Sequence, residues 1–196
     1  MKLINFSITN FRSIKKTDNL QFSQSTILIG RNNEGKSNVL KALNIAMNTL
    51  KKHPEDKRYR YKSRLGMPTR RREDIYDWER DFPMSLQNDE SNSESIFKLG
   101  FELTPHEIEE LETLIGTHLK TIIINNLLTL EIHLGKERKQ KINTIQKGRA
   151  IKAISTNSNK IAAFIGDRIS FTYIPAVRTD QEAVSVVEEM MSQQLS

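Results

Sequence analysis

The alternation of apolar and polar residues predicts strands near the N-terminus and a helix after them. Ile4, Phe6 and Ile8 alternate with polar neighbours, as the residues of a half-buried strand do. A second apolar stretch, residues 26–29, predicts another strand. Apolar residues at three- and four-residue spacing then predict a helix over residues 37–50. The side chains expected on its buried stripe are Val39, Leu40, Leu43, Met47 and Leu50.

Alternation returns in the second half of the chain and predicts further strands. Residues 96–103 alternate between apolar and polar side chains. Residues 128–134 and 141–145 also alternate, and residues 135–137 between them predict the turn of a basic β-hairpin. Residues 169–174 predict one more strand, which ends before a proline.

Helices are predicted between and after these strands. Thr104, Pro105 and Glu107 form the start signature of a helix, because threonine can cap it, proline fits its first position and glutamate completes a capping box. Its expected buried residues are Ile108, Leu111 and Leu114. Two more helices are predicted over residues 159–165 and 180–195, and the last resembles the base of a longer helix that is cut short.

Composition shifts divide the chain into four segments. Residues 51–95 contain three prolines, are highly charged and show weak periodicity, with one short helix predicted near residues 73–80. The expected segments are a strand–loop–helix core (1–50), a basic insertion (51–95), a β-rich lobe with the capped helix and the basic hairpin (96–179), and the start of a long helix (180–196).

Positive charge is concentrated in two stretches. The net charge is +6, yet residues 51–72 hold ten Lys and Arg against two acids, a local balance of +8, so the remainder sums to about −2. Residues 136–152 hold seven Lys and Arg and one Glu. Such concentration favours contact with a polyanion over a general effect on solubility.

Composition excludes several classes of protein. A hydrophobic share of 37% supports a folded core. No apolar run approaches the roughly 18 residues of a membrane-spanning helix, and residues 1–6 lack the apolar centre of a secretory signal. The absence of cysteine excludes disulfides, Cys-ligated metals and thiol catalysis. We therefore expect a cytoplasmic protein without a membrane partner.

Residues 30–37 match the phosphate-binding pattern G-x-x-x-x-G-K-[ST]. Gly30 and Gly35 permit the tight turns that aim backbone N–H groups at a phosphate, and the following helix adds its N-terminal N–H groups. Lys36 supplies a mobile positive charge for the β- and γ-phosphates, and the Ser37 hydroxyl is a hard oxygen ligand for Mg²⁺. We therefore predict a P-loop (Walker A) site for ATP, with Ser37 as the Mg²⁺ ligand.

The loop and its surroundings resemble the SMC-like ABC ATPases, a family that includes the RecF, SMC and OLD (overcoming lysogenisation defect) groups. Asn32 and residues 37–43 are similar to the family form G-x-N-x-x-G-K-S-N-[LIV]-[LI]-x-A-L. Residues 10–14, Asn-Phe-Arg-Ser-Ile, are similar to the opening of the same proteins, in which the arginine lies beside the nucleotide. The loop pattern and the resemblance give the expected nucleotide-binding residues Arg12, Gly30, Asn32, Asn33, Glu34, Gly35, Lys36, Ser37 and Asn38.

Residues 173–178, Tyr-Ile-Pro-Ala-Val-Arg, are similar to a strand end of OLD-type ATPases that a long helix follows. This resemblance implies an α/β fold: the N-terminal lobe of an ABC-type P-loop NTPase, with a mixed and antiparallel sheet. It also implies an ATP-dependent endonuclease of antiphage defence, in which ATPase heads dimerise around two nucleotides and gate DNA binding. The implied partners are DNA, a second copy and an additional protein subunit.

Parts that hydrolysis and cleavage require are missing from this sequence. The eight glycines are isolated and none follows a serine, so there is no LSGGQ-type signature loop. The nearest Walker B look-alike, residues 161–167, lacks a glutamate after Asp167 and is better interpreted as a helix. No two aspartates lie two apart, which excludes the Asp-x-Asp pair of a Toprim nuclease. We therefore assign no catalytic residue to this chain.

Several other residues are candidates for contacts. Gln181 and Gln87 are Q-loop candidates by order alone, and Trp78 and Phe82 are expected to anchor the insertion to the core. The candidate nucleic-acid contacts, which alternate in part with tyrosines, are Arg58, Arg60, Lys62, Arg64, Arg70, Arg71 and Arg72. A second candidate set on the hairpin is Lys136, Arg138, Lys139 and Lys141. For both sets, two other interpretations stay open: a solvated loop, or a surface that binds an acidic protein partner.

The sequence thus predicts the ATP-binding part of an SMC-like or OLD-type ATPase that couples ATP binding and hydrolysis to DNA binding or cleavage. Two alternatives stay open at this point. One is a RecF-like or SMC-like DNA repair ATPase without a nuclease. The other is a non-catalytic binding module that a nucleotide gates.

Overall fold

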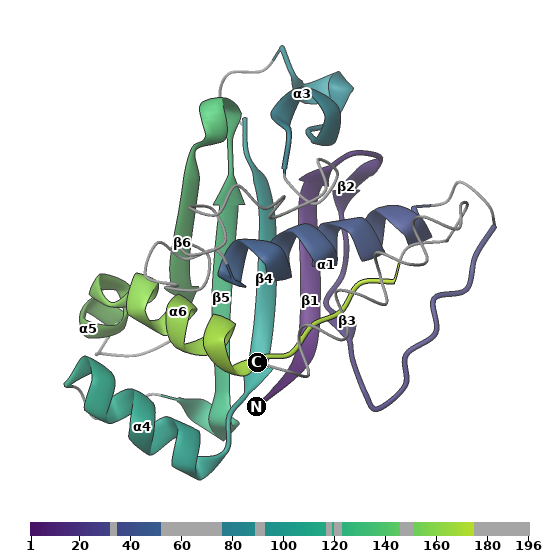
Figure 1. Ribbon diagram of the computed structural model, residues 1–196. Coiled ribbons are helices and arrows are strands. Elements are labelled where there is room, and N and C mark those ends of the chain that lie inside the picture. Colours follow the sequence, from purple (N-terminus) through teal and green to yellow (C-terminus); the bar gives the residue numbers. More distant parts are fainter. Residues whose placement is uncertain are drawn as a thin grey trace, which may run out of the picture.

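A computed structural model describes residues 1–31, 35–51, 76–88, 93–116, 119, 123–145 and 151–174. Six strands form one sheet in this part of the chain (Figure 1). They are β1 (Lys2–Phe11), β2 (Ile14–Lys16), β3 (Leu20–Gln21), β4 (Ser95–Glu102), β5 (Leu127–Leu134) and β6 (Gln140–Ile145).

The sheet has the order β2-β1-β4-β5-β6, and β3 pairs with β1 as well. β2 pairs with the end of β1 and β3 with its first half, so both cover the same edge of β1. All of these described pairings are antiparallel. The sequence predicted a sheet with both parallel and antiparallel pairs. Among the residues that the structure describes, only the antiparallel pairs are present.

Helices cover one face of the sheet and its two ends. α1 (Lys36–Lys51) and α6 (Ser158–Arg168) lie across one face, and α5 (Ile151–Thr156) precedes α6 (Figure 1). α3 (Trp78–Asp81) lies at the end of the sheet where β1 finishes, and α4 (Pro105–Ile115) lies at the other end (Figure 1). Three short 3₁₀ helices also lie within the described ranges: η2 (Met84–Leu86), η3 (Ile124–Asn126) and η4 (Lys136–Arg138).

The core lies between the sheet and the two crossing helices. Phe6 of β1 stacks on Phe97 of β4 with ring centroids 6.3 Å apart, and Phe11 meets the same ring edge-on at 5.5 Å. Strand residues of β5 and apolar residues of α1 and α6 complete this core, and all are buried: Leu128, Leu130, Ile132, Ile45, Met47, Ile161 and Ile165. Burial alternates strictly along β5, and along β4 with the exception of Gly100, which explains why sequence pattern alone located these strands.

Most of the predicted elements are confirmed. β1, β4, β5 and β6 lie where alternation placed strands, and η4 occupies the predicted hairpin turn. α4 has the expected capping box, since the Glu107 N–H donates to Thr104 Oγ1 (3.3 Å) and Glu107 Oε2 accepts from the Thr104 N–H (2.8 Å). α6 extends the helix predicted over residues 159–165, and α3 overlaps the end of the one predicted near residues 73–80.

The strands predicted over residues 26–29 and 169–174 are not formed in the structure. Both segments lack a ladder with any described strand. Ile27 is 78% exposed, Ile29 91% and Ile174 61%, so their apolar side chains find no covering layer here. The segment after α6 is held instead by Lys51 at the end of α1, whose Nζ donates to the Phe171 carbonyl (3.0 Å). A short apolar run predicts a strand only where a neighbouring strand is present to pair with it.

Two helix residues predicted as buried are exposed. Leu40 in α1 and Leu114 in α4 are each 47% exposed. In α1 the buried stripe turns toward Ala42, Ile45 and Ala46, because the helix packs on α6 as well as on the sheet. The predicted helix over residues 180–195 lies outside the described residues. None of the described helices has the length and apolar character to cross a membrane.

Candidate nucleotide-binding site

The phosphate-loop sequence leads directly into α1. Gly35 has φ +91°, in the left-handed region that favours glycine, and its carbonyl accepts from the Val39 N–H (2.9 Å) as the first turn of the helix begins. Lys36 and Ser37 therefore stand in the first turn, where free backbone N–H groups attract anions. Asn32, Asn33 and Glu34 lie outside the described residues.

The Lys36 side chain turns back into the loop. Its Nζ donates to the carbonyl oxygens of Gly30 and Arg31, each at 2.5 Å. The ammonium group thus stands between the residues where the loop begins and the helix where it ends. This places a positive charge inside the loop, where the motif predicts the phosphates. Ser37 is exposed on the same turn, so its hydroxyl is accessible to a metal ion.

Asn38 connects the start of α1 to the turn between β1 and β2. Its Nδ2 donates to Ser13 Oγ at 2.9 Å. A Cβ built on Gly35 would lie 3.7 Å from Ser13 Oγ and 3.8 Å from Ile14 Cγ1, so the turn lies directly against the end of the loop. The predicted motif over residues 10–14 and the phosphate loop are therefore neighbours in space. The direct contact of Asn38 with a nucleotide stays a prediction.

One residue near the end of β1 and one in the turn that follows have left-handed backbones. Asn10 has φ 55° and Arg12 has φ 51°. Asparagine enters this region more readily than most residues, whereas for arginine the conformation is strained. The Asn10 carbonyl accepts a hydrogen bond from Ser95 Oγ, and Tyr76 Oη pairs with the same hydroxyl at 2.9 Å. Burial raises the pKa of Tyr76, so its hydroxyl remains protonated in this contact.

Arg12 is bound to Asp81 at the end of α3. Its backbone N–H donates to the Asp81 carbonyl (2.7 Å) and its Nε donates to Asp81 Oδ1 (2.8 Å). Nη2 lies 2.8 Å from the same carboxylate oxygen. The Arg12 side chain is 20% exposed, while the Asp81 side chain is fully buried. Arg12, the residue predicted to contact the nucleotide, is thus bound by the carboxylate of Asp81, a residue that the sequence did not indicate.

Asp81 also accepts from its own helix. Arg80 Nη2 lies 2.6 Å from Oδ2, and the Asp77 N–H donates to the same oxygen at 3.0 Å. Burial raises the pKa of Asp81, but the hydrogen bonds from Arg80, from the Asp77 N–H and from Arg12 outweigh it, so the pKa lies below its ordinary value. Asp81 is therefore a carboxylate in the folded protein, and it balances two guanidinium groups.

α3 itself is firmly anchored, as the sequence predicted for Trp78 and Phe82. The two rings stack with centroids 5.2 Å apart, and Phe82 is 2% exposed. Trp78 Nε1 donates to the Ser93 carbonyl at 2.8 Å. Lys136 of the hairpin turn places its Nζ 5.0 Å from the centre of the Trp78 ring. The basic hairpin and α3 therefore lie together at one end of the sheet (Figure 1).

The structure bears on only some of the other candidates. The seven arginine and lysine candidates between residues 58 and 72, Gln181 and residues 175–178 lie outside the described residues. Gln87 donates to the carbonyls of Glu79 and Phe82, both at 3.2 Å, so it serves the loop after α3. Residues 161–167 belong to α6, which confirms that the Walker B look-alike is a helix.

Two other polar or hollow places lie away from the phosphate loop. On the outer sheet face, His133 contacts Glu94 (2.8 Å) and Glu131 (2.7 Å), and Glu131 pairs with Lys98 (2.7 Å). Within the described ranges, no group of three His, Cys, Asp or Glu side chains is arranged to hold a metal ion.

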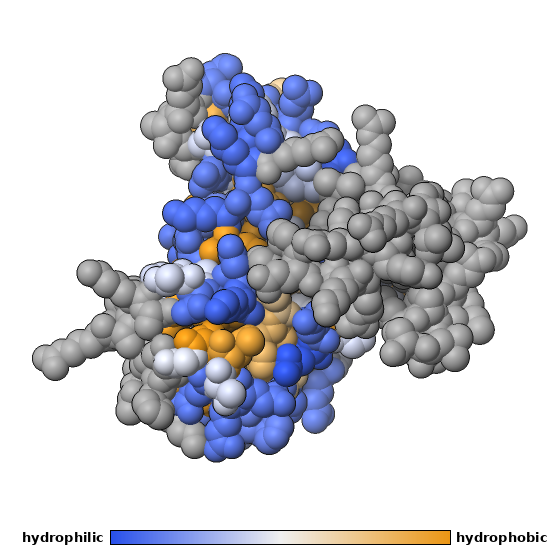
Figure 2. Space-filling model, turned by 60° about the vertical axis from the view of Figure 1, so that its left-hand side comes forward, coloured by the Kyte–Doolittle hydropathy of each residue, from blue (hydrophilic) through white to orange (hydrophobic). Residues whose placement is uncertain are grey.

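Figure 2 shows apolar patches between hydrophilic residues on the side of the molecule that it faces.

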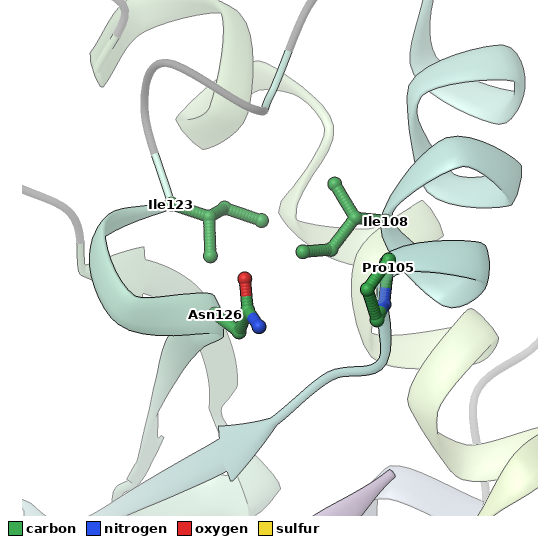
Figure 3. Close-up of a pocket in the computed structure, with 4 residues that line it drawn as sticks. All are labelled: Pro105, Ile108, Ile123 and Asn126. Atoms are coloured by element: carbon green, nitrogen blue, oxygen red, sulfur yellow. The ribbon is translucent and has the colours of Figure 1, made fainter.

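A small pocket lies between α4 and η3, and Figure 3 shows Ile108 and Ile123 pointing toward each other across it. Pro105 and Asn126 complete its lining, and its volume is about 220 Å³. Ligand sites are usually larger, at roughly 300–1,000 Å³. Since α4 lies at the opposite end of the sheet from α3 (Figure 1), this pocket is separate from the phosphate loop.

Comparison with known proteins relates most of the chain to one family. Residues 1–181 match the family described as "AAA ATPase domain". One similar solved structure comes from work on "Structural biochemistry of ATP-driven dimerization and DNA stimulated activation of SMC ATPases". It shares 12% sequence identity with a TM-score of 0.41, over 96% of this chain and 98% of that chain. No curated protein matches.

Proposed function

This chain belongs to the AAA ATPase domain family, and from that premise we propose that it binds ATP with Mg²⁺ at residues 30–37 and Arg12. The observation that carries the proposal is the position of Lys36. Its ammonium group is held by two loop carbonyls at 2.5 Å at the start of α1, and the first N–H groups of a helix have no partner within the helix. A triphosphate is the ligand that this arrangement suits best.

The residues present also fit a magnesium ion that accompanies the nucleotide. Ser37 is exposed in the first turn of α1, directly after the lysine that faces the loop. A serine hydroxyl together with phosphate oxygens forms the hard oxygen set that Mg²⁺ prefers. When bound, Mg²⁺ neutralises phosphate charge. The protein's own part is to orient the phosphates with backbone N–H groups and Lys36.

We propose further that ATP binding controls contact with DNA and association with a second copy. The support for DNA is the basic balance of residues 51–72, together with the hairpin whose Lys136 lies against α3. The support for self-association is the resemblance to ATPases that dimerise around nucleotides. The more specific role, as the regulatory lobe of an OLD-type antiphage nuclease, is supported by the resemblance of residues 173–178. Any additional protein subunit would belong to that same assembly.

The first experiment measures Mg-ATP binding by calorimetry for the wild-type chain, Lys36→Ala and Lys41→Ala. Lys41 is the matched control, because it is a lysine of the same helix outside the loop motif. We expect Lys36→Ala to weaken binding at least tenfold, as the loss of a charge-assisted contact does. Lys41→Ala should bind as the wild type does. Equal affinity of wild type and Lys36→Ala would reject the proposed site.

The same three proteins test the DNA proposal. Binding to a short duplex is measured by fluorescence anisotropy, with and without Mg-ATP, at low and at physiological salt. We expect ATP to change the affinity of the wild type and of Lys41→Ala but not of Lys36→Ala. The affinity should fall with rising salt, because phosphate contacts release counterions. No binding at low salt would refute the DNA proposal and leave the ATP site standing.

A further inference from the structure

We propose that Asp81 is a positioning residue of the nucleotide site: it fixes the guanidinium of Arg12, a residue of the turn that lies against the end of the phosphate loop, so that Arg12 can contact bound ATP. This inference rests on the proposed function, since Arg12 has that role only if the loop binds ATP. Asp81 lies in a different part of the sequence from both Arg12 and the loop. No motif in the sequence points to it.

The Asp81 carboxylate is buried, which supports a positioning role. Its side chain is fully buried, and removing a charge from water is costly unless it is paired and hydrogen-bonded. Asp81 meets that requirement with two arginines, of which Arg12 reaches it from the turn after β1. Buried ion pairs contribute little stability compared with apolar residues of similar volume. The arrangement therefore fits the placing of a guanidinium better than the stabilising of a core.

The backbone of Arg12 is strained, and this strain also supports a positioning role for Asp81. An arginine at φ 51° is held there only when its surroundings fix it, and such strain concentrates at functional sites. Asp81 supplies the fixing contacts, one from its carbonyl to the Arg12 N–H and one from its carboxylate to Nε. A single residue thus fixes both the backbone and the side chain of Arg12.

Part of the Arg12 guanidinium is not engaged by Asp81 and can bind a phosphate. A guanidinium has five N–H donors in a planar fork. Asp81 engages Nε and Nη2, and within the described part of the chain no acceptor contacts Nη1. The side chain is 20% exposed, so part of it is accessible to solvent. A carboxylate on one edge leaves the other edge for a phosphate.

Arg12 lies close to the phosphate loop along the chain of contacts. Ser13, the residue after Arg12, accepts a hydrogen bond from Asn38 in the first turn of α1. Gly35 lies against the same serine. Arg12 is therefore one residue from a direct contact with the loop. On its other side it is attached to α3, which the Asp77 cap and the Trp78–Phe82 stack keep in place.

A double-mutant cycle on Mg-ATP affinity tests the proposal. The four proteins are wild type, Arg12→Ala, Asp81→Asn and the double variant, with folding checked by circular dichroism melts. We expect each single change to weaken Mg-ATP binding about tenfold, as the loss of one charge-assisted hydrogen bond does. In the Arg12→Ala background, Asp81→Asn should change the affinity less than twofold, because Asp81 acts through Arg12.

Other results would overturn the inference. If Asp81→Asn weakens binding equally with and without Arg12, its role is structural. If Arg12→Ala binds Mg-ATP as the wild type does, Arg12 does not contact the nucleotide, although Lys36 dependence would keep the ATP site itself. Loss of Lys36 dependence would instead refute the proposed function.

Two further variants keep the test decisive. Glu79→Gln removes a negative charge from an exposed position of the same helix and should leave Mg-ATP affinity unchanged. If Asp81→Asn does not fold, Asp81→Glu replaces it in the cycle. That variant keeps the buried charge and displaces the contact atoms by one methylene group, so the same dependence on Arg12 is expected.

Discussion

At the scale of single residues, Arg12 has a left-handed backbone that costs conformational free energy, and its side-chain contacts offset that cost. Left-handed backbone costs a non-glycine residue roughly 1–2 kcal/mol, whereas glycine enters the region freely. We therefore expect Arg12→Gly to be more stable than Arg12→Ala by about 0.5–1 kcal/mol, because both lose the ion pair but only alanine keeps the strain. Urea unfolding at neutral pH measures the difference.

The matched control for that pair is Lys15 in β2. It is exposed and lies in an ordinary strand, where glycine is less stable than alanine by roughly 0.5–1 kcal/mol. The sign of the glycine–alanine difference should therefore reverse between positions 12 and 15. The same sign at both positions would mean that Arg12 is not strained in solution.

The sequence located single residues within their elements correctly where a short local motif carries the signal. Lys36 and Ser37 stand at the start of a helix as the loop pattern requires, and Trp78 and Phe82 anchor α3 as expected. Asp81 was missed, because its importance depends on a contact with a residue far away in the sequence. One aspartate among several in a charged segment gives no local signal of burial.

At the scale of elements, the crossing of α1 and α6 depends on Gly166. A Cβ at this position would lie 2.6 Å from the Leu50 carbonyl oxygen, which belongs to the α1 backbone and cannot easily move. In an exposed helix, Gly→Ala is stabilising by roughly 1 kcal/mol. Here we expect Gly166→Ala to destabilise the fold by about 1–3 kcal/mol through overpacking, as measured by urea unfolding.

A neighbouring position provides the comparison for Gly166. Asp167 is the next residue of α6 and is exposed, so Asp167→Ala should stay within about 0.5 kcal/mol of the wild type. Stabilisation by Gly166→Ala would show that the two helices are farther apart than the structure has them.

Element prediction depended on how much of the necessary information is local. α4 was predicted well, because Thr104, Pro105 and Glu107 define its start and Gly116 ends it with φ 67°. The segment of residues 26–29 was predicted wrongly as a strand, because pairing depends on a partner that a local apolar run does not reveal. The face that α1 buries was likewise shifted by α6, which lies far along the chain.

At the scale of the whole molecule, three carboxylates with a lowered pKa make the free energy of unfolding depend on pH in the acidic range. Burial raises the pKa of Glu107 and Glu131 as it does for Asp81, but their partners outweigh it. Those partners are the Met1 amine and Thr104 for Glu107, and Lys98 and His133 for Glu131. Because each folded pKa lies below the unfolded one, the stabilisation is complete above the ordinary carboxyl range and is lost as pH falls through the folded values.

We therefore expect the free energy of unfolding to decrease steadily from about pH 5 to about pH 3. Chemical denaturation at several pH values measures it. Glu131→Gln removes one of the titrating groups, so its curve should be flatter than that of the wild type over this interval. A wild-type stability that is level or increases toward acid would contradict the lowered pKa values.

The order of strands in the sheet has a consequence for the kinetics of folding. β4 and β5 are separated by residues 103–126 and β5 and β6 by residues 135–139, whereas β1 must find β4 across the longer stretch of residues 12–94. Closing a long loop costs more entropy than closing a short one, so we expect the three-strand meander to form first and β1 to dock last. The phosphate loop lies within that long connection. The nucleotide site would thus assemble in the final step of folding, and detachment of β1 would dismantle it while the meander persists.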